Sequence, residues 1–283
     1  MNSIGVKRKD YRYVIGRVAL YLVILALTAV MLIPFLWMVS ASLKLNQDVF
    51  TYPVKWIPEE LQWSNYITIW ETIPLLTFFK NSVKLTVIIT GIQVLTSSFA
   101  AYAFAKLNFK GRDTLFVLYI CTIAVPWQVY MVRQYIMVGR MGLTDSHLGM
   151  ILMQSFTAIG VFLMRQFYMG VPDELCEAAR IDGMSEYKIY AKIMIPLSKG
   201  GIATLIISSF VTVWNDFMGP LIYLRSNEKK TLQLGLRMFI SQYSSEYNLI
   251  MAASIISLIP VFIMFVGLQR FFTEGIASSG IKG

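Results

Sequence analysis

Long apolar runs divide this chain, and its charged residues stand mainly between them. A helix rises ~1.5 Å per residue, so about 20 apolar residues cross a hydrocarbon core of ~30 Å. Runs of roughly this length cover residues 18–39, 85–105, 115–132, 148–164, 200–224 and 249–268. A signal peptide is the alternative for the first run, but its apolar part has only about 7–15 residues. The pattern therefore predicts an all-α membrane protein with six transmembrane helices, the first of them uncleaved.

Basic residues indicate which side of the membrane each loop faces. Six spans place both termini on one side, and the loops of that side hold fifteen of the 25 Lys and Arg residues. The opposite loops hold nine, and Lys84 lies at the edge of a span. Cytoplasmic loops carry the excess of positive charge. The loop 225–237 opposes the trend, but the cluster before the first span decides the sign. We expect both termini to be cytoplasmic.

The stretch between the first two runs, residues 44–80, is polar and contains three tryptophans and three prolines. Proline ends helices because it lacks a backbone N–H, so we expect an ordered external segment with short helices. Residues 1–72 then comprise the cytoplasmic N-terminal segment, the first span and this external segment. Residues 73–272 form a permeation core of five spans, and residues 273–283 form a cytoplasmic tail.

Composition supports the membrane class. Hydrophobic residues make up 56% of the chain and charged residues 14%, whereas a soluble domain carries about 25% charged residues. The net charge is +9, but the Lys and Arg residues flank the apolar runs and form no basic stripe with interleaved aromatics. Nucleic acid is therefore not expected as a partner. Cys121, Cys176 and the single histidine, His147, follow no disulfide or metal-binding spacing.

One polar connection differs from the others. Residues 171–197, between the fourth and fifth runs, carry five acidic and three basic residues, and they far exceed the usual connection of about 4–6 residues. Pro172 and Asp173 predict the start of a helix with Asp173 as its cap. Gly183 predicts its end, because glycine tolerates the left-handed position after a helix.

A second helix, residues 186–194, is expected after the cap Ser185 and before Pro196. Two short helices joined at a fixed elbow would form a rigid lever, whereas the alternative is an ordinary solvated loop.

The first insert helix has distinct faces. Glu174 and Glu177 lie in its first turns, where acidic groups favour the helix dipole, and Glu177 can reach Arg180 one turn later. Ala178 and Ala179 add little bulk, which would allow a partner to approach the backbone closely. A polar, capped insert between two membrane spans favours contact with a soluble partner.

The sequence EAARIDGMSEYKIYAKIMIPL, residues 177–197, resembles the EAA signature of binding-protein-dependent ABC importer permeases. Its positions are filled by Glu177, Ala178, Ala179, Asp182, Gly183 and Pro196. The similarity extends over most of the chain and is greatest to the maltose-type carbohydrate permeases, as in PFLWM, FAAYAFAKLNFKGR, VPWQV, LMRQF and WNDF. One departure is Cys176, where the family commonly has a polar residue. The resemblance implies a type I ABC importer permease fold in the bacterial inner membrane.

The resemblance also implies roles and partners. The first insert helix would be the coupling helix, seated in a groove of a cytoplasmic ATP-binding subunit. Its ATPase-coupling residues would be Glu174, Glu177, Ala178, Ala179, Arg180, Asp182 and Gly183. The implied partners are two ATP-binding subunits, a second and different permease subunit, an external solute-binding protein and the lipid bilayer. The tail, residues 269–283, resembles a terminal segment that also reaches the ATPase pair.

The chain contains no GxxxxGK[ST] phosphate loop. We therefore expect no cofactor on this chain and no ATP hydrolysis by it, with ATP and Mg bound by the partner ATPase subunits.

Candidate pathway residues lie inside the predicted spans. Asp216 is the one acid there, and a charge at mid-helix costs about 2.5–3.5 kcal/mol. With Asn215 it is either a gate or pathway residue, or a hydrogen-bonded tie to a neighbouring helix. Gln128, near Pro126 in the third span, is a further candidate pathway residue. Pro126 in the third span and Pro260 in the sixth either break their spans to admit polar backbone to a cavity or only kink them. Kinking alone is the preferred interpretation.

Tryptophans also mark one side of the predicted spans. Trp37, Trp127 and Trp214 fall in the outward halves of three spans. An aromatic belt at the outer interface is preferred to a platform that stacks on sugars.

The solute class follows from the neutral polar groups of the spans. Gln93, Thr96 and Ser98 are examples, and such groups suit an uncharged polyhydroxylated solute better than an anion. We expect import of a sugar or oligosaccharide by alternating access, with a sugar phosphate or a polyamine as the alternative solute. An ion-coupled secondary carrier would show several intramembrane ionisable groups and internal repeats. A receptor or scaffold would not need a capped lever.

Overall fold

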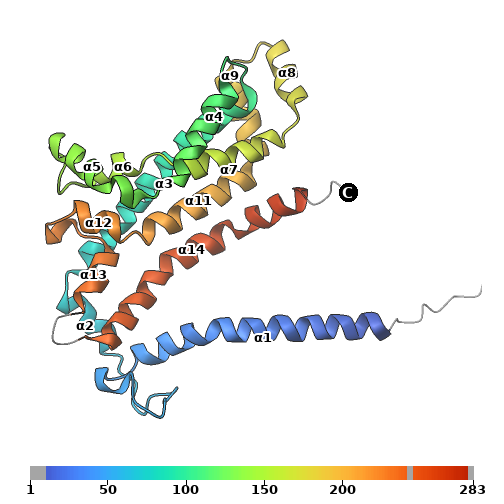
Figure 1. Ribbon diagram of the computed structural model, residues 1–283. Helices are drawn as coiled ribbons and strands as arrows, with labels where there is room; N and C mark the ends of the chain where they lie inside the picture. The colour runs from blue at the N-terminus through green and yellow to red at the C-terminus, as the bar shows by residue number, and fades with distance from the viewer. Residues whose placement is uncertain (1–10, 241–244, 280–283) are drawn as a thin grey trace, which may run out of the picture. The chain divides into compact units, whose positions relative to one another are not determined.

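The computed structural model describes residues 11–240 and 245–279, and over these residues it contains helices and no strand (Figure 1). The long or membrane-type helices are α1 (Tyr11–Ser42), α3 (Leu75–Lys106), α4 (Arg112–Cys121), α5 (Trp127–Arg140), α6 (His147–Gln154), α7 (Ala158–Met169), α11 (Lys199–Trp214), α12 (Met218–Tyr223) and α14 (Tyr247–Ser279). The shorter elements are η1 (Asn46–Asp48), α2 (Asn65–Thr72), η2 (Thr122–Ala124), α8 (Asp173–Ile181), α9 (Glu186–Ile189), the π-helical η3 (Tyr190–Met194), α10 (Ile195–Leu197), η4 (Asn227–Lys229) and α13 (Leu232–Met238).

Three helices are long and apolar enough to cross a membrane unaided, namely α1, α3 and α14. Three further candidates are bent pairs: α4–η2 with α5 at 98°, α6 with α7 at 44°, and the segment Glu186–Leu197 with α11 at 82°. The all-helical class is therefore confirmed, with three continuous spans and up to three broken ones. Residues 1–10 and 280–283, which hold most of the N-terminal basic cluster and the end of the predicted tail, lie outside the described residues.

The helices form two compact units. The first comprises residues 1–69 and 239–255, and the second residues 70–238 and 256–283. In the first unit Asn65 ties three segments together: its amide donates to the carbonyl oxygens of Ser42 and Lys44, each at 2.9 Å, and its side-chain oxygen accepts from Asn248 at 3.0 Å. Residues 13–36 of α1 expose every side chain, as a helix that faces lipid would.

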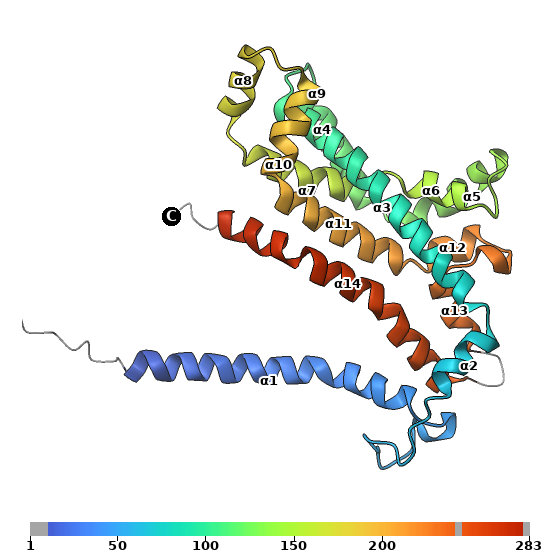
Figure 2. The ribbon, with the colours of Figure 1, turned by 180° about the vertical axis from the view of Figure 1, so that it is seen from behind.

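Helix α3 is the centre of the second unit, where it packs against α7, α11, α6 and α13 (Figures 1 and 2). The fit depends on small residues. Gly160 of α7 lies where an added Cβ would be 2.5 Å from the Ser97 hydroxyl of α3 and 3.0 Å from Leu205 of α11. Small residues at helix interfaces allow backbones to approach closely in membranes.

The second span begins earlier than predicted. The polar segment was expected to continue to residue 80, but α3 starts at Leu75. Polar side chains are accommodated in its first turns because they bond to a neighbouring loop. The Asn81 amide donates to the carbonyl oxygens of Glu228 (2.8 Å) and Lys230 (3.0 Å), and the Ser82 hydroxyl accepts from the Leu232 N–H (2.8 Å).

The third span is broken and not merely kinked, so the preferred interpretation of Pro126 is wrong. Val125 is extended and Pro126 stands directly before α5. Proline cannot donate to the preceding turn and forces its predecessor out of the helical region, which permits the 98° bend. Pro260, in contrast, lies inside the uninterrupted α14.

The predicted aromatic belt is wrong for Trp214. Its ring is 2% exposed, stacks on Phe210 at a centroid distance of 5.9 Å and meets Phe79 edge-on at 5.8 Å. Its indole N–H donates to the Ser257 carbonyl oxygen at 3.0 Å. This tryptophan is a core residue because the last turn of α11 is packed on all sides.

The close packing at Gly160 predicts a stability difference between two glycines. Gly160→Val should destabilise the protein by about 1–3 kcal/mol, because the new side chain overlaps Ser97 and Thr157. Gly91→Val in α3 is the matched control, since no atom lies within 4 Å of its added Cβ. Thermal unfolding in detergent or nanodiscs measures both variants. Equal losses would contradict the packing described here.

Candidate functional site

The polar insert is built as two short helices with a sharp turn between them. Helix α8 ends at Ile181, and Gly183 follows with a φ of +78°. The Met184 N–H bonds to the Ala179 carbonyl oxygen (2.9 Å) and the Gly183 N–H to that of Arg180 (3.0 Å). This pair of bonds is a Schellman motif. The predicted helix end at Gly183 is confirmed, because glycine adopts the left-handed conformation without a Cβ clash.

Both predicted side-chain caps are wrong. Pro172 is the N-cap of α8 and Ser185 that of α9, and neither makes a capping bond through its side chain. Asp173 lies inside the first turn of α8, where it pairs with Lys106. Each helix start is held instead by contacts to α3.

The second insert helix runs further than predicted. It continues through the π-turn of η3 and through Pro196 to Leu197, and the chain bends at Ser198. A π-turn shifts the hydrogen-bond pattern by one residue, and Pro196 stands at the start of the following turn. The missing N–H of Pro196 is tolerated there, so the proline does not end the helix.

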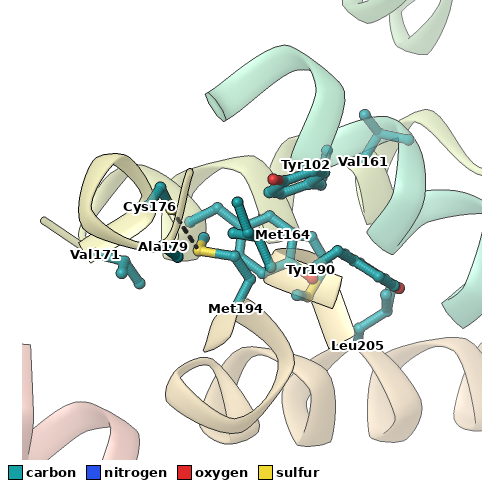
Figure 3. Close-up of a cluster of buried hydrophobic side chains, with 12 residues drawn as sticks. Tyr102, Val161, Met164, Val171, Cys176, Ala179, Tyr190, Met194 and Leu205 are labelled. Atoms are coloured by element: carbon teal, nitrogen blue, oxygen red, sulfur yellow. Dashed lines mark hydrogen bonds between the residues drawn. The ribbon is translucent and has the colours of Figure 1, made fainter. Parts of the chain in front are cut away.

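Helix α8 has one buried face. Cys176 and Ala179 pack into a cluster that includes Met164, Tyr102 and Met194 (Figure 3). The Cys176 thiol lies 3.6 Å from the Met194 sulfur. Ala179, one of the predicted coupling residues, therefore faces the core of its own chain.

The outer face of the insert carries the other predicted coupling residues. The exposed ones are Glu174, Glu177, Ala178, Arg180, Asp182 and Gly183. Within the described residues Glu174, Glu177 and Asp182 form no ion pair, and the expected Glu177–Arg180 pair is absent. Arg180 turns instead to Glu186 of α9, with Nε donating to Oε1 at 2.7 Å. That pair spans the elbow and holds α8 against α9.

A buried lysine anchors the start of α8. The Lys106 side chain, 3% exposed, donates to the Val171 carbonyl oxygen at 2.6 Å and to the carboxylate of Asp173. The neighbouring ammonium group lowers the pKa of Asp173 below its ordinary value. The sequence analysis did not predict this anchor. The signal that could have indicated it is a lysine directly after an apolar run, in a chain that also has an acidic insert.

Asp216, the candidate pathway acid, ties two segments together through hydrogen bonds of its carboxylate. Gln154 at the end of α6 donates to its Oδ2 at 2.7 Å, and the Gly219 N–H donates to its Oδ1 at 3.1 Å. The span predicted over residues 200–224 is interrupted here, between α11 and α12. Asp216 thus caps the new helix start and joins it to the fourth span. Asn215 and Gln128 are exposed, and Pro126 marks the break before α5.

Two neutral polar residues of α3 form hydrogen bonds to the backbone where the fourth span is interrupted. The Gln93 amide donates to the Gln154 carbonyl oxygen (2.7 Å), and the Thr96 hydroxyl to that of Ser155 (3.0 Å). Both carbonyls lack a continuing helix, since α6 ends here. Gln93 and Thr96, two of the neutral polar residues of the spans, are therefore engaged in hydrogen bonds within the fold.

A helical bundle with broken spans and a stiff polar insert between two of them is typical of the membrane subunit of a solute importer. Residues 16–278 match the family described as binding-protein-dependent transport system inner membrane component, and the chain belongs to this family. The predicted resemblance and the multi-pass inner-membrane location are confirmed. The sidedness of the termini stays a prediction.

Relatives and a solved structure agree with this assignment. The arabinooligosaccharides transport system permease protein AraQ of Halalkalibacterium halodurans is 34% identical over 253 residues, which cover 88% of this chain and 91% of AraQ. AraQ of Bacillus subtilis is 32% identical over 279 residues, 98% of this chain and 99% of that protein. The crystal structure of a bacterial ABC transporter involved in the import of the acidic polysaccharide alginate is similar with a TM-score of 0.78 at 25% identity, covering 95% of this chain and 100% of that one.

The tie at Asp216 can be separated from a pathway role. Asp216→Ala leaves the Gln154 amide and the Gly219 N–H without their acceptor, so we expect a loss of stability of about 1–3 kcal/mol. Asn215→Ala, next in sequence and exposed, is the control and should cost much less. Thermal unfolding in nanodiscs measures both. Unchanged stability of Asp216→Ala with loss of transport would instead support a gate.

The Lys106–Asp173 pair predicts a pH dependence. Because the folded pKa of Asp173 is lowered, the pair stabilises the protein above the unfolded pKa of about 3.9 and this stabilisation is lost as the pH falls through the folded pKa. Asp173→Asn should therefore lower the unfolding temperature near pH ~7, and the difference from wild type should shrink below about pH 4. A difference that vanishes between about pH 8 and 6 would point to another group.

Proposed function

We propose that this chain is one transmembrane subunit of an ATP-driven importer. It would move a sugar or oligosaccharide, delivered by an external binding protein, into the cell by alternating access. The observation that carries the proposal is the family match over residues 16–278, joined to the geometry of the insert. The chain is a transport component, and ATP hydrolysis is assigned to two partner subunits because the sequence has no phosphate loop.

The insert faces the cytosol in this proposal. The loops on the side of the termini hold the larger share of Lys and Arg, as cytoplasmic loops do. ATP and Mg would bind the two ATPase subunits. Their closure would displace the insert and change the balance between inward-open and outward-open states.

The exposed surface of the insert suits a groove on such a subunit. Its side chains include Ile181, which is 87% exposed, and Tyr187, which is 78% exposed. The acidic side chains of Glu174, Glu177 and Asp182 are exposed on the same insert. Large exposed apolar groups ringed by charges mark interaction sites. The expected partner surface is therefore an apolar groove with a basic rim.

The predicted coupling residues divide into two roles within this proposal. Glu174, Glu177, Ala178 and Asp182 would contact the ATPase subunit, since their side chains are exposed and unpaired within the described chain. Ala179 and Arg180 would support the contact from behind, and Gly183 would permit the turn.

The relatives support a carbohydrate as the solute, since two of them are named for arabinooligosaccharide transport. The similar solved transporter acts on an acidic polysaccharide, so the fold is compatible with neutral and charged sugars. A sugar phosphate or a polyamine remains the alternative solute. An ion-coupled carrier is disfavoured because both oxygens of Asp216 are already engaged. A second, different permease subunit would complete the pathway.

Purification of the complex tests the proposal. Expressed with its neighbouring genes and extracted in detergent, the chain should co-purify with two ATP-binding subunits and a second permease. A stable monomer without an ATPase would overturn the proposal.

Charge reversal on the insert tests the docking face. Glu177→Lys should weaken ATPase association by about tenfold or more, because it places a cation against the expected basic rim. Membrane insertion should be unchanged. Glu228→Lys is the matched control, an exposed acid of η4 outside the insert. Equal recovery of the ATPase with both variants in a pull-down would contradict the contact.

A further inference from the structure

An apolar groove lies between α3, α4 and the fourth span, all within the second compact unit (Figures 1 and 2). Its volume is about 430 Å³. Helix α4 meets α3 over far fewer residues than α7 does, which leaves this space open beside it. The groove is lined by side chains of α3, of α4 and of the break in the fourth span, namely Thr96, Ala100, Phe104, Leu115, Tyr119 and Phe156.

The groove has the depth of one leaflet of a bilayer. Thr96, Ala100 and Phe104 are four residues apart, so they line one face of α3 over about 12 Å of its axis. Leu115 and Tyr119 form a similar stripe on α4. One leaflet contributes about half of a hydrocarbon core of ~30 Å. The groove therefore ends near the middle of the membrane, whereas a helix of another subunit would need an apolar face across both halves.

The lining suits a hydrocarbon chain and not a sugar. Its polar groups are few, and the Thr96 hydroxyl already donates to the Ser155 carbonyl oxygen at 3.0 Å. Phe156 is 70% exposed and stands where the fourth span is interrupted. A sugar would need several convergent hydrogen-bonding groups. A hydrocarbon chain would bury the exposed Phe156 ring and leave no polar group of its own unpaired.

Positive charge is in excess at one end of the groove. The turn between α3 and α4 forms a second, polar hollow, which residues 108–114 line. The Arg112 Nε lies 3.2 Å from Oδ1 of Asp113, and Nη2 of Arg165 lies 3.5 Å from the same oxygen. One carboxylate thus serves two guanidinium groups. Lys110 is exposed and forms no ion pair within the described part of the chain, and the nearby Lys106 is already paired with Asp173.

Arg165 joins the apolar groove to the charged turn. Its Nε donates to the Phe104 carbonyl oxygen at 3.2 Å, and its guanidinium carbon lies 4.1 Å from the centroid of the Phe116 ring. The cation is thereby held at the boundary between the hydrocarbon groove and the turn, with its charged end directed to the polar side. A phospholipid has its phosphate at this boundary, and arginine is well suited to bind phosphate.

We propose that this groove binds one anionic phospholipid. An acyl chain lies between α3 and α4, and the phosphate lies among Lys110, Arg112 and Arg165. Basic pockets beside membrane helices on the cytoplasmic side bind anionic head groups, and in the proposed orientation the lipid belongs to the cytoplasmic leaflet. The lipid fills the space beside α4, next to the 98° break of the third span. This inference does not depend on the solute or on the ATP-binding partners.

Lipid retention tests the head-group contacts. The complex is stripped of lipid in detergent and titrated with phosphatidylglycerol or phosphatidylcholine, and native mass spectrometry counts the bound lipid. Phosphatidylglycerol should be retained in preference. Lys110→Gln combined with Arg112→Gln should weaken its binding by roughly twenty- to thirtyfold, because two cations are lost. Arg133→Gln combined with Arg140→Gln is the charge-matched control, two exposed cations of α5.

Thermal unfolding separates a lipid from a free phosphate group. Phosphatidylglycerol should raise the unfolding temperature of the unaltered complex and of the Arg133/Arg140 control. Glycerol phosphate, which has the phosphate but no acyl chain, should not. Ala100→Trp fills the groove and should abolish both the retention and the temperature shift. Leu95→Trp is its control, since Leu95 is exposed on α3 and does not line the groove.

A photo-cross-linking side chain identifies the occupant even if Ala100→Trp does not fold. Phe156→benzoylphenylalanine places the reactive group in the groove at an exposed position. After irradiation in membranes, the chain should gain the mass of a phospholipid.

Four outcomes would each overturn the lipid site. They are equal retention of the two lipids, head-group variants that behave like the Arg133/Arg140 control, equal stabilisation by glycerol phosphate, and a cross-link from position 156 to another subunit. The last would assign the groove to a partner helix. Each leaves the importer assignment intact, because that assignment is tested separately by the subunits that co-purify.

Discussion

Backbone hydrogen bonding is the constraint on which this structure depends. A helix that breaks inside a membrane leaves N–H and C=O groups that no water can satisfy. The fourth and fifth spans both break, and side chains supply what the backbone lost. Gln93 and Thr96 bond to freed carbonyls of the fourth span, and Asp216 accepts the free N–H of Gly219. These polar residues lower the hydropathy of the spans, but their hydrogen bonds allow the spans to bend.

The same helix, α3, provides most of this compensation. Its middle turns satisfy the fourth span, its first turns bond to the loop around residue 230, and its last turns hold the insert. Small residues let its neighbours approach closely, as at Gly160. Several of the buried polar groups of α3 therefore bond outside their own helix, as those of Asn81, Gln93 and Lys106 do. A transporter that must move as rigid parts benefits from one helix bonded to several others.

The insert shows how charge is distributed between support and recognition. Lys106 pairs with Asp173, and Arg180 pairs with Glu186. The Lys106 side chain is buried, where an unpaired charge would be costly. Glu174, Glu177 and Asp182 are exposed to solvent on the other face and form no ion pair with the part of the chain that the structure describes. Inward-facing pairs keep the elbow rigid, and outward-facing charges remain available. The separation follows from packing, since all these residues are equally polar in sequence.

The sequence by itself determined the membrane class, the approximate positions of six apolar segments, the helical elbow at Gly183 and the family. These depend on local properties: apolar length, glycine's freedom at positive φ, and a contiguous motif. Only the tertiary structure decided that Pro126 breaks its span, that Trp214 is buried, that Asp216 bonds to Gln154 and that Arg180 pairs with Glu186. Each of these depends on a partner distant in sequence or on how far neighbouring helices let the chain bend. A single sequence gives the length and polarity of a segment, but the bonds that let a polar residue sit in a membrane are made between segments.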